Sequence, residues 1–170
     1  TVLAARLLSE KKIEKIVLTR PAVEAGENLG FLPGDLQQKV DPYLRPLFDS
    51  LHNIFGSEKT NSLIDKGIIE VVPLAFMRGR TLEDSLIILD EAQNTTKAQM
   101  KMFLTRLGER SKMIVNGDIT QIDLKNSNES GLIDAINTFS DVDQIMFCHL
   151  TTEDIVRHTL VQKIIEAYKN

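Results

Sequence analysis

The feature that most constrains the fold is an unbroken apolar run, Leu86 to Leu89, that leads directly into Asp90 and Glu91. A continuous run of this kind cannot leave one face in water, so it predicts a central parallel strand covered by helices on both sides. In an open α/β sheet, ligands collect at the carboxyl ends of the strands. The sequence therefore predicts a binding site where this strand ends.

Two interpretations of the acidic pair stay open from this stretch alone. In the first, Asp90 holds the metal of a magnesium nucleotide, and Glu91 orients or deprotonates the attacking water. In the second, the two acids only begin the helix that follows, because Asp and Glu favour helix starts. An apolar run followed by acids is a motif with many false positives, so it does not decide between the two.

Composition predicts one globular domain that spans residues 1–170. The chain is 42% hydrophobic and 26% charged, with no stretch long and apolar enough for a membrane span and no secretory signal. Its one cysteine, Cys148, lies in an apolar run, which predicts a buried thiol in a reducing, cytoplasmic compartment. The net charge of -4 argues against a protein that grips nucleic acid by bulk electrostatics, so any such contact requires a local patch.

The remaining patterns alternate between helix and strand along the whole chain, which predicts an α/β fold. Besides the central strand, we expect strands at residues 16–18, 68–72, 113–116 and 144–150. We expect helices at residues 1–8, 42–55, 58–66, 97–107, 131–139 and 153–168. Residues 21–42 carry prolines and glycines among acids and predict a long loop, and loops of this length are often functional.

A second polar box follows the strand expected at residues 113–116. It contains Gly117, Asp118 and Gln121, so a polar group from this tip can lie beside Asp90 if the two strands are neighbours. Gln121 is then placed to sense a γ-phosphate or position a water, because an amide does this without adding charge. The alternative is an ordinary turn, since Asn-Gly-Asp also favours turns.

Several basic residues have both a binding and a plain interpretation. Arg78 and Arg80 bracket a glycine and could clamp phosphate, or could be ordinary exposed charges. Arg157, near the start of the last helix, is either a solvated charge or an arginine finger offered to a neighbouring subunit. The densest positive charge is either a solvated helix face or a nucleic-acid track, and comprises Lys97, Lys101, Arg106, Arg110 and Lys112.

Seven boxes in this order resemble the PhoH-like family. They are Thr19–Glu27, Leu29–Asp35, Asp41–Pro46, Arg78–Thr81, Asp90–Asn94, Gly117–Gln121 and Arg157–Gln162. Members of this family are P-loop ATPases whose core is similar to that of superfamily 1 RNA helicases. The resemblance implies a RecA-like three-layer sandwich with a mainly parallel sheet, whose first strand and phosphate loop are missing from this sequence.

The resemblance also implies ATP and Mg²⁺ as ligands. On the family pattern Asp90 and Glu91 are the Walker B acids, with Asp90 on the metal and both acids, together with Gln121, in catalytic roles. The residues expected to contact the nucleotide are Thr1, Arg20, Asp90, Gly117, Asp118 and Gln121.

One departure from the family concerns the phosphate-binding loop. No Gly-x-x-x-x-Gly-Lys-Thr segment is present, and Thr1 to Ala4 resemble the continuation of that motif. Thr1 would then be its terminal hydroxyl and a second magnesium ligand beside Asp90. We therefore expect an N-terminally truncated ATPase domain that binds ATP poorly without the missing segment.

The function implied by the resemblance is ATP hydrolysis coupled to RNA remodelling or unwinding. The implied assembly is a homo-oligomer, in the family a ring that could be hexameric, in which Arg157 acts on the nucleotide of a neighbouring subunit. A different interpretation is an ATP-dependent switch that recruits RNA-processing partners without motor activity. The acidic net charge and the lack of an aromatic stacking box favour this second interpretation.

Overall fold

The computed structural model of this chain describes residues 1–21, 36–151, 154 and 158–168. The chain divides into two compact units, Thr1–Thr138 and Phe139–Asn170, and each unit is described by itself. The first unit contains the whole sheet and the residues that follow its strands.

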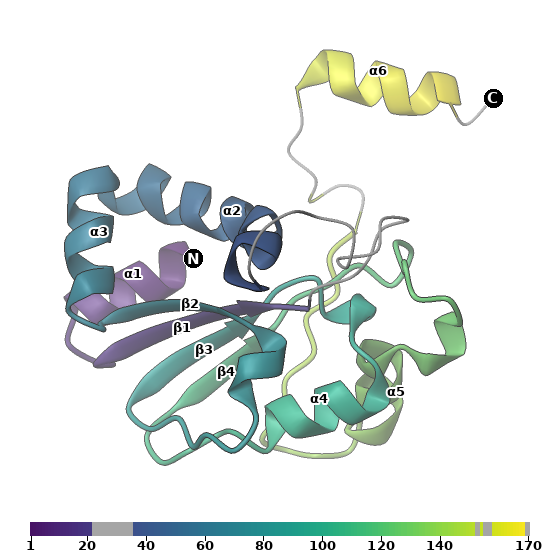
Figure 1. Cartoon of the computed structure of the whole chain (residues 1–170). Coiled ribbons are helices and arrows are strands. Elements are labelled where there is room, and N and C mark those ends of the chain that lie inside the picture. The colour runs from purple at the N-terminus through teal and green to yellow at the C-terminus, as the bar shows by residue number, and fades with distance from the viewer. Residues whose placement is uncertain (22–35, 152–153, 155–157, 169–170) are drawn as a thin grey trace. The chain divides into compact units, whose positions relative to one another are not determined.

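The sheet has four strands, all parallel, in the spatial order β2-β1-β3-β4 (Figure 1). They are β1 (Lys15–Arg20), β2 (Ile69–Pro73), β3 (Ser85–Leu89) and β4 (Lys112–Val115). All residues of β3 are buried, which is the burial expected for an internal strand with both faces covered. The predicted central parallel strand is therefore confirmed.

Helices cover both faces of this sheet (Figure 1). One face carries α1 (Val2–Ser9), α2 (Leu36–Phe55) and α3 (Ser57–Asp65). The other carries the short helix η2 (Leu74–Met77), α4 (Lys97–Leu104) and α5 (Gly131–Thr138). Two further short turns are η3 (Ala92–Asn94) and η4 (Ser127–Glu129).

Successive strand residues supply two separate hydrophobic cores. Ile16 and Leu18 of β1 face the first helical layer, whereas Val17 faces the second. This alternation is the period of an extended strand, in which neighbouring side chains point to opposite faces of a sheet. The result is a three-layer α/β sandwich, and it confirms the predicted fold class, one consistent with a P-loop NTPase.

Helix α2 begins earlier than the sequence suggested. It starts at Leu36, so the C-terminal part of the long loop expected at residues 21–42 is helical, and that prediction is wrong there. Pro42 and Pro46 lie inside this helix, although proline removes a backbone donor. The sequence predicts a helix start at Pro42, because proline is common in the first turn, and this start is wrong. In the described part of the chain, no helix is both long enough and apolar enough to cross a membrane.

The second unit differs most from the sequence-based expectation. Residues 144–150 form no strand, because a strand needs a neighbour for its backbone hydrogen bonds and the unit supplies none among its described residues. Cys148 is consequently exposed, not buried. Helix α6 (Thr159–Tyr168) starts later than the predicted 153–168, and its apolar Leu160 and Ile164 are exposed.

An ion-pair cluster links β1, β2 and the segment before β3. Arg80 donates from both terminal nitrogens to the two carboxylate oxygens of Glu70, at 2.6 and 2.8 Å, and Lys15 Nζ lies 2.6 Å from Glu70 Oε2. The Arg80 hydrogen bonds, followed by Lys15, lower the pKa of Glu70 from 4.5 to about 2 against the opposing effect of burial. Arg80 is thus engaged within the fold, which argues against its role as a phosphate clamp.

We predict that Glu70→Gln lowers the free energy of unfolding by about 1–2 kcal/mol at pH 7, because it leaves two half-buried cations without their anion. A depressed folded-state pKa stabilises the protein above the unfolded value of 4.5, and that contribution is lost as the pH falls toward about 2. Urea unfolding across this pH range should therefore show the two proteins converging in acid. Glu109→Gln, at a side chain 83% exposed, serves as the control. A difference that does not change with pH would contradict the assignment.

Candidate functional site

The site is built by the register of three neighbouring parallel strands. Thr19 pairs with Leu89, and Leu89 pairs with Val115, so β1, β3 and β4 reach the same level of the sheet. The backbone nitrogen of Asp90 donates to Thr19 O at 3.0 Å, which extends the ladder by one residue. The residues that follow the paired positions are therefore brought side by side at the carboxyl edge.

Arg20, at the end of β1, faces the two acids at the end of β3. Its Nη2 lies 2.6 Å from Glu91 Oε1 and 3.5 Å from Asp90 Oδ2. Its Nη1 donates to the backbone carbonyl of Tyr43 in α2 at 3.3 Å, and its buried Nε has no hydrogen-bond partner among the residues that the structure describes. The Arg20 side chain is only 18% exposed, so one cation partly neutralises two adjacent carboxylates in a largely enclosed position.

Asp90 is oriented by the tip of β4. Asn116 Nδ2 donates to Asp90 Oδ1 at 2.8 Å, and Asn116 N donates to Leu89 O at 2.8 Å. Asn116 O in turn accepts the backbone N–H of Ala92 at 2.9 Å. One residue thus fixes both the backbone and the side chain at the end of β3.

Glu91 has an unusual backbone conformation. Its φ of 53° and ψ of 38° place it in the left-handed region, which disfavours residues with a side chain. Its Oε1 accepts from Arg20 at 2.6 Å, and its Oε2 accepts from Gln93 Nε2 at 2.6 Å. Strained backbone held in place by its surroundings concentrates at functional sites, so this turn is a functional candidate.

Gln93 joins the β3 turn to the segment that follows β4. Its side-chain nitrogen donates to Glu91 Oε2 and also to Gln121 O, the latter at 3.1 Å. Its side-chain oxygen accepts the backbone N–H of Asp118 at 3.1 Å. Gln93 itself is 1% exposed, whereas its partner Glu91 is 40% exposed at the pocket.

Gly117 is the point where the second segment passes over Gln93. A Cβ placed on Gly117 would lie 2.6 Å from Gln93 Oε1, 3.0 Å from Gln93 N and 2.8 Å from Leu132 Cδ2. Real Cβ atoms do not approach other atoms so closely, so only glycine fits here without a shift of its neighbours. Close packing accounts for a glycine at this position, and its expected contact with a nucleotide stays a prediction.

Asp118 organises the turn that carries Gln121. Its Oδ1 accepts from Thr120 N at 2.8 Å and from Thr120 Oγ1 at 2.6 Å. Its Oδ2 accepts from Gln121 Nε2 at 2.7 Å. The turn interpretation of this box is therefore correct in local geometry, and the turn also delivers Gln121 to the site.

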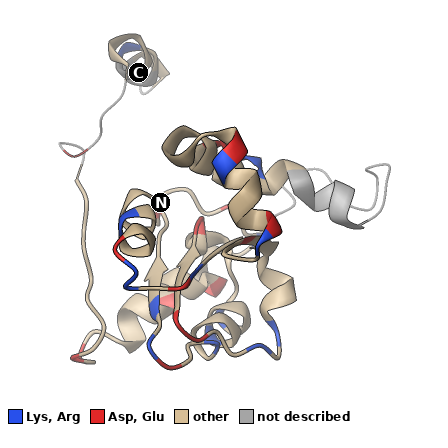
Figure 2. Cartoon of the chain, turned by 90° about the vertical axis from the view of Figure 1, so that its left-hand side faces the viewer, with Lys and Arg blue, Asp and Glu red and all other residues tan. Residues whose placement is uncertain are grey.

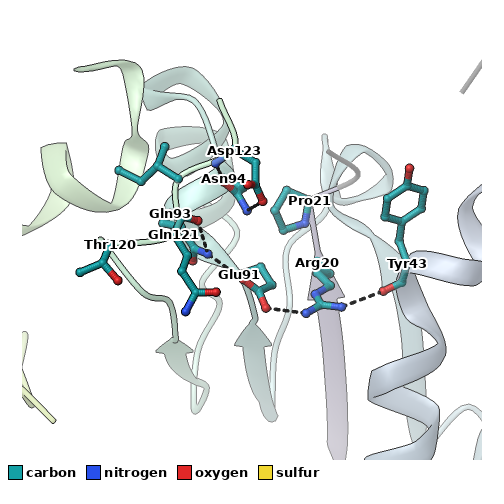
Figure 3. Close-up of a pocket in the computed structure, with 10 residues that line it drawn as sticks. Arg20, Pro21, Tyr43, Glu91, Gln93, Asn94, Thr120, Gln121 and Asp123 are labelled. Atoms are coloured by element: carbon teal, nitrogen blue, oxygen red, sulfur yellow. Dashed lines mark hydrogen bonds and ion pairs between the residues drawn. The ribbon is translucent and has the colours of Figure 1, made fainter. Parts of the chain in front are cut away.

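These residues surround a pocket of about 460 Å³ at the carboxyl edge of the sheet (Figure 3). Arg20, Pro21 and Tyr43 lie on one side, and Glu91 lies between them and the opposite side, in contact with Arg20 (Figure 3). The other lining residues are Gln93, Asn94, Thr120, Gln121, Ile122 and Asp123. This volume is within the range of small-ligand sites.

Helix capping does not account for the acidic pair. The N-cap of α4 is Thr96, whose hydroxyl accepts from Gln99 N, while Gln99 Oε1 accepts from Thr96 N at 2.8 Å. Glu91 precedes η3 and makes no side-chain cap bond there. Both acids face Arg20 and Glu91 lines the pocket, so the capping interpretation is not supported.

The PhoH-like protein family matches residues 1–169 of this chain. The chain belongs to the PhoH-like family. It is 61% identical over 167 residues to a PhoH-like protein of Bacillus subtilis (strain 168), covering 98% of this chain and 52% of that protein. A PhoH-like protein of Synechocystis sp. is 60% identical over 99% of this chain and 51% of its own length. Protein PhoH of Escherichia coli (strain K12) is 47% identical over 97% of this chain and 47% of its own.

This PhoH-like chain spans about half the length of the curated relatives it matches. Within it, Arg20, Glu91 and Gln121 line one pocket, and Asp90 contacts Arg20 at its edge. Gly117 packs against Gln93, and the backbone N–H of Asp118 donates to the Gln93 side chain, so both lie next to the pocket. Most of the expected nucleotide-contacting residues are therefore gathered in one place.

Two expected site residues are not part of this group. Thr1 precedes α1 as its N-cap, makes no side-chain cap bond, and is not among the described residues that line the pocket. Arg157 lies outside the described residues. Their assignments to magnesium and to a neighbouring subunit's nucleotide stay predictions.

Sequence reasoning missed four members of the site. Gln93 and Asn116 orient the acids, Tyr43 accepts from Arg20, and Asn94 Oδ1 accepts from Asp123 N at 2.8 Å. Gln93 and Asn94 belong to the acidic box itself, and their polarity directly after a buried strand was a usable signal. Tyr43 offered no such signal, because it contributes a backbone carbonyl.

Three of the five basic residues around α4 are engaged within the fold, two of them in ion pairs. Lys97 Nζ lies 2.8 Å from Asp134 Oδ1, Arg110 Nη2 lies 2.7 Å from Asp84 Oδ2, and Arg106 donates to the carbonyl of Arg80 at 3.0 Å. Figure 2 shows blue and red segments interspersed along the described chain. A solvated, paired surface thus accounts for this charge better than a nucleic-acid track.

We predict that Gly117→Ala lowers the free energy of unfolding by about 1–3 kcal/mol, because the added methyl group overpacks the contact with Gln93. Thermal or urea unfolding measures the loss. In a Gln93→Ala background the same change should cost at least about 1 kcal/mol less, since the closest clashing atom is gone. Strictly additive losses in the double variant would contradict the close approach.

Proposed function

We propose that the protein binds and hydrolyses ATP at the carboxyl edge of its sheet, with Mg²⁺ as the metal. The observation that carries the proposal is the meeting of Arg20, Asp90 and Glu91 at the ends of two adjacent parallel strands. Membership of the PhoH-like family, whose fold is of the P-loop NTPase type, supports the same conclusion.

The donor set suits magnesium bound together with a nucleotide. Among the described residues, no group of three or more His, Cys, Asp or Glu side chains could hold a metal by itself. Mg²⁺ in nucleotide sites needs only one or two carboxylates, because waters and phosphate oxygens complete its octahedral shell. Asp90, aligned by the amide of Asn116 at 2.8 Å, fits the role of that single carboxylate.

The chain's own groups then divide the chemistry. Asp90 supplies a metal ligand, and Glu91 accepts a proton from the attacking water or orients it. Gln121 places a neutral amide at the pocket wall, where it senses the terminal phosphate. Bound Mg²⁺ would neutralise charge on the phosphates, a task that the engaged guanidinium of Arg20 does not perform alone.

We further propose that ATP turnover is coupled to RNA remodelling. This step rests on the family's similarity to superfamily 1 RNA helicases, and on the direct link between the acidic turn and the 118–121 segment through Gln93. Arg157 would reach the nucleotide of a neighbouring copy in a ring-shaped homo-oligomer. The chain covers about half the length of its relatives, so the activity of the whole protein is part of this proposal.

A second candidate function is an ATP-dependent switch that recruits an RNA-processing partner. The contacts of Lys97, Arg110 and Arg106 within the fold favour it, because they engage three of the five cations around α4 that could otherwise contact an RNA backbone. Both functions use the same pocket, and they differ in whether RNA accelerates hydrolysis.

We predict that Glu91→Gln in the intact protein lowers the rate of ATP hydrolysis by about 100-fold or more, because it removes the proposed base. The dissociation constant for ATP should change by no more than about 3-fold, since Glu91 acts on water and not on the nucleotide. Single-turnover hydrolysis and calorimetric titration measure the two quantities. Glu83→Gln, at an exposed acid before β3, is the matched control. Hydrolysis at the normal rate in Glu91→Gln would remove the proposed base.

We also predict that single-stranded RNA raises the ATP turnover of the intact protein by about 10-fold or more if it moves along RNA. Phosphate contacts dominate such binding, so the stimulation should weaken steeply with added salt. The measurement is steady-state hydrolysis with and without an unstructured RNA, at two salt concentrations. Turnover that RNA leaves unchanged would instead favour the recruiting switch.

A further inference from the structure

We infer that Gln93 is a positioning residue that holds the carboxylate of Glu91 and the 118–121 segment at a fixed separation. This inference rests on the proposed function for its meaning, because Glu91 is the residue through which Gln93 acts. It assigns to Gln93 a task distinct from metal or phosphate binding, since its side chain contacts only protein atoms in the bonds described here.

The first argument is that the hydrogen-bonding groups of this amide are fully committed. A glutamine side chain has two N–H donors and one carbonyl acceptor. Here the donors reach Glu91 Oε2 at 2.6 Å and Gln121 O at 3.1 Å, and the oxygen accepts from Asp118 N at 3.1 Å. The orientation of the amide is fixed by these partners, since the carboxylate can only accept and the backbone N–H can only donate.

The second argument is that the surroundings leave this side chain no freedom. Gln93 is 1% exposed, and its backbone carbonyl accepts from the hydroxyl of Ser130 at 2.8 Å. Gly117 passes so close that a methyl group there would lie 2.6 Å from Gln93 Oε1. A buried polar network that is fully satisfied specifies one arrangement, because an unpaired group in it would be costly.

The third argument concerns what the arrangement can transmit. Arg20 of β1 donates to one carboxylate oxygen of Glu91, and Gln93 of η3 donates to the other. The orientation of the carboxylate plane is therefore fixed from two elements. The 118–121 segment carries the side chain of Gln121 at the pocket wall. If a ligand displaces this segment, the hydrogen-bonded side-chain amide of Gln93 moves with it. The orientation of the Glu91 carboxylate then changes as well.

The test uses two variants of the intact protein. Gln93→Met keeps the length of the side chain and removes all of its hydrogen bonds. Gln93→Glu keeps an acceptor for Asp118 N and removes both donors. In both variants we expect kcat for ATP hydrolysis to fall about 10-fold to 100-fold while KM changes by less than about 3-fold. The reason is that the lost hydrogen bond orients the carboxylate of Glu91, the proposed base, and does not contact the nucleotide.

A double-mutant cycle separates positioning from general damage. In a Glu91→Gln background, Gln93→Met should cause no further loss in the single-turnover rate, because Gln93 acts through Glu91. A merely structural role would instead multiply the two losses. Gln99→Met is the matched control, since it removes a hydrogen-bonded glutamine of the α4 capping box outside the pocket and should leave kcat unchanged.

Amide hydrogen exchange tests the same link without nucleotide. In Gln93→Met the amide of Asp118 loses its acceptor and should exchange at least about 10-fold faster, whereas in Gln93→Glu it should stay protected. Glu91→Gln should not change the exchange of Asp118. Exchange that is equal in all variants would overturn the proposed link.

The outcomes distinguish this inference from the proposed function. If the intact protein does not hydrolyse ATP, or if Glu91→Gln hydrolyses it normally, the proposed function fails, and with it the role of Gln93 in aiming a base. If Glu91→Gln is inactive but the Gln93 variants keep the normal kcat, or the losses multiply in the double variant, only the positioning role fails.

Discussion

The constraint on which the site depends is the parallel register of β1, β3 and β4. Because Thr19, Leu89 and Val115 lie at one level, the chain leaves all three strands at the same edge. Arg20 and Asp90, which follow the paired residues Thr19 and Leu89, are therefore brought together by strand pairing and not by loop conformation. A shift of β3 by one residue would move its acids to a different level and would also exchange the two hydrophobic faces of the strand, so core packing protects the site's geometry.

The turn after β3 combines backbone strain with electrostatic support. Glu91 occupies a left-handed conformation, a cost of about 1–2 kcal/mol for a residue with a side chain, and it brings a second carboxylate beside Asp90. Arg20 and the amide of Gln93 offset part of this cost through charge-assisted hydrogen bonds of 2.6 Å. The strained residue Glu91 thus has both of its carboxylate oxygens held by hydrogen bonds, and strain that its surroundings support in this way is common at functional sites.

The sequence predicted those parts of the fold and the site that depend on residues close together in the chain. The apolar run of β3 requires burial on both faces, so the strand, the sheet type and the place of the acids all followed from it. Arg20 and Asn116, which contact those acids, are distant from them in sequence. The carbonyl of Tyr43 that holds Arg20 leaves no pattern that reveals it, whereas Gln93 follows Glu91 by two residues and is polar directly after a buried strand. The strand predicted at residues 144–150 is wrong for a different reason. The local apolar pattern favours a strand, but it says nothing about whether a neighbouring strand is present to accept its backbone hydrogen bonds.

The contacts in the pocket also limit how a ligand can act there. The guanidinium of Arg20 already binds Glu91 and the Tyr43 carbonyl, so an anion that binds Arg20 must compete with the acid. Exchange of one hydrogen-bonded partner for another has a small net free energy, because the bonds lost and gained are similar in strength. Anion binding at Arg20 and release of Glu91 would then be coupled by a single guanidinium, and the Tyr43 contact extends that coupling to α2. The buried Nε of Arg20, which has no partner in the described part of the chain, is the donor that such an exchange would satisfy.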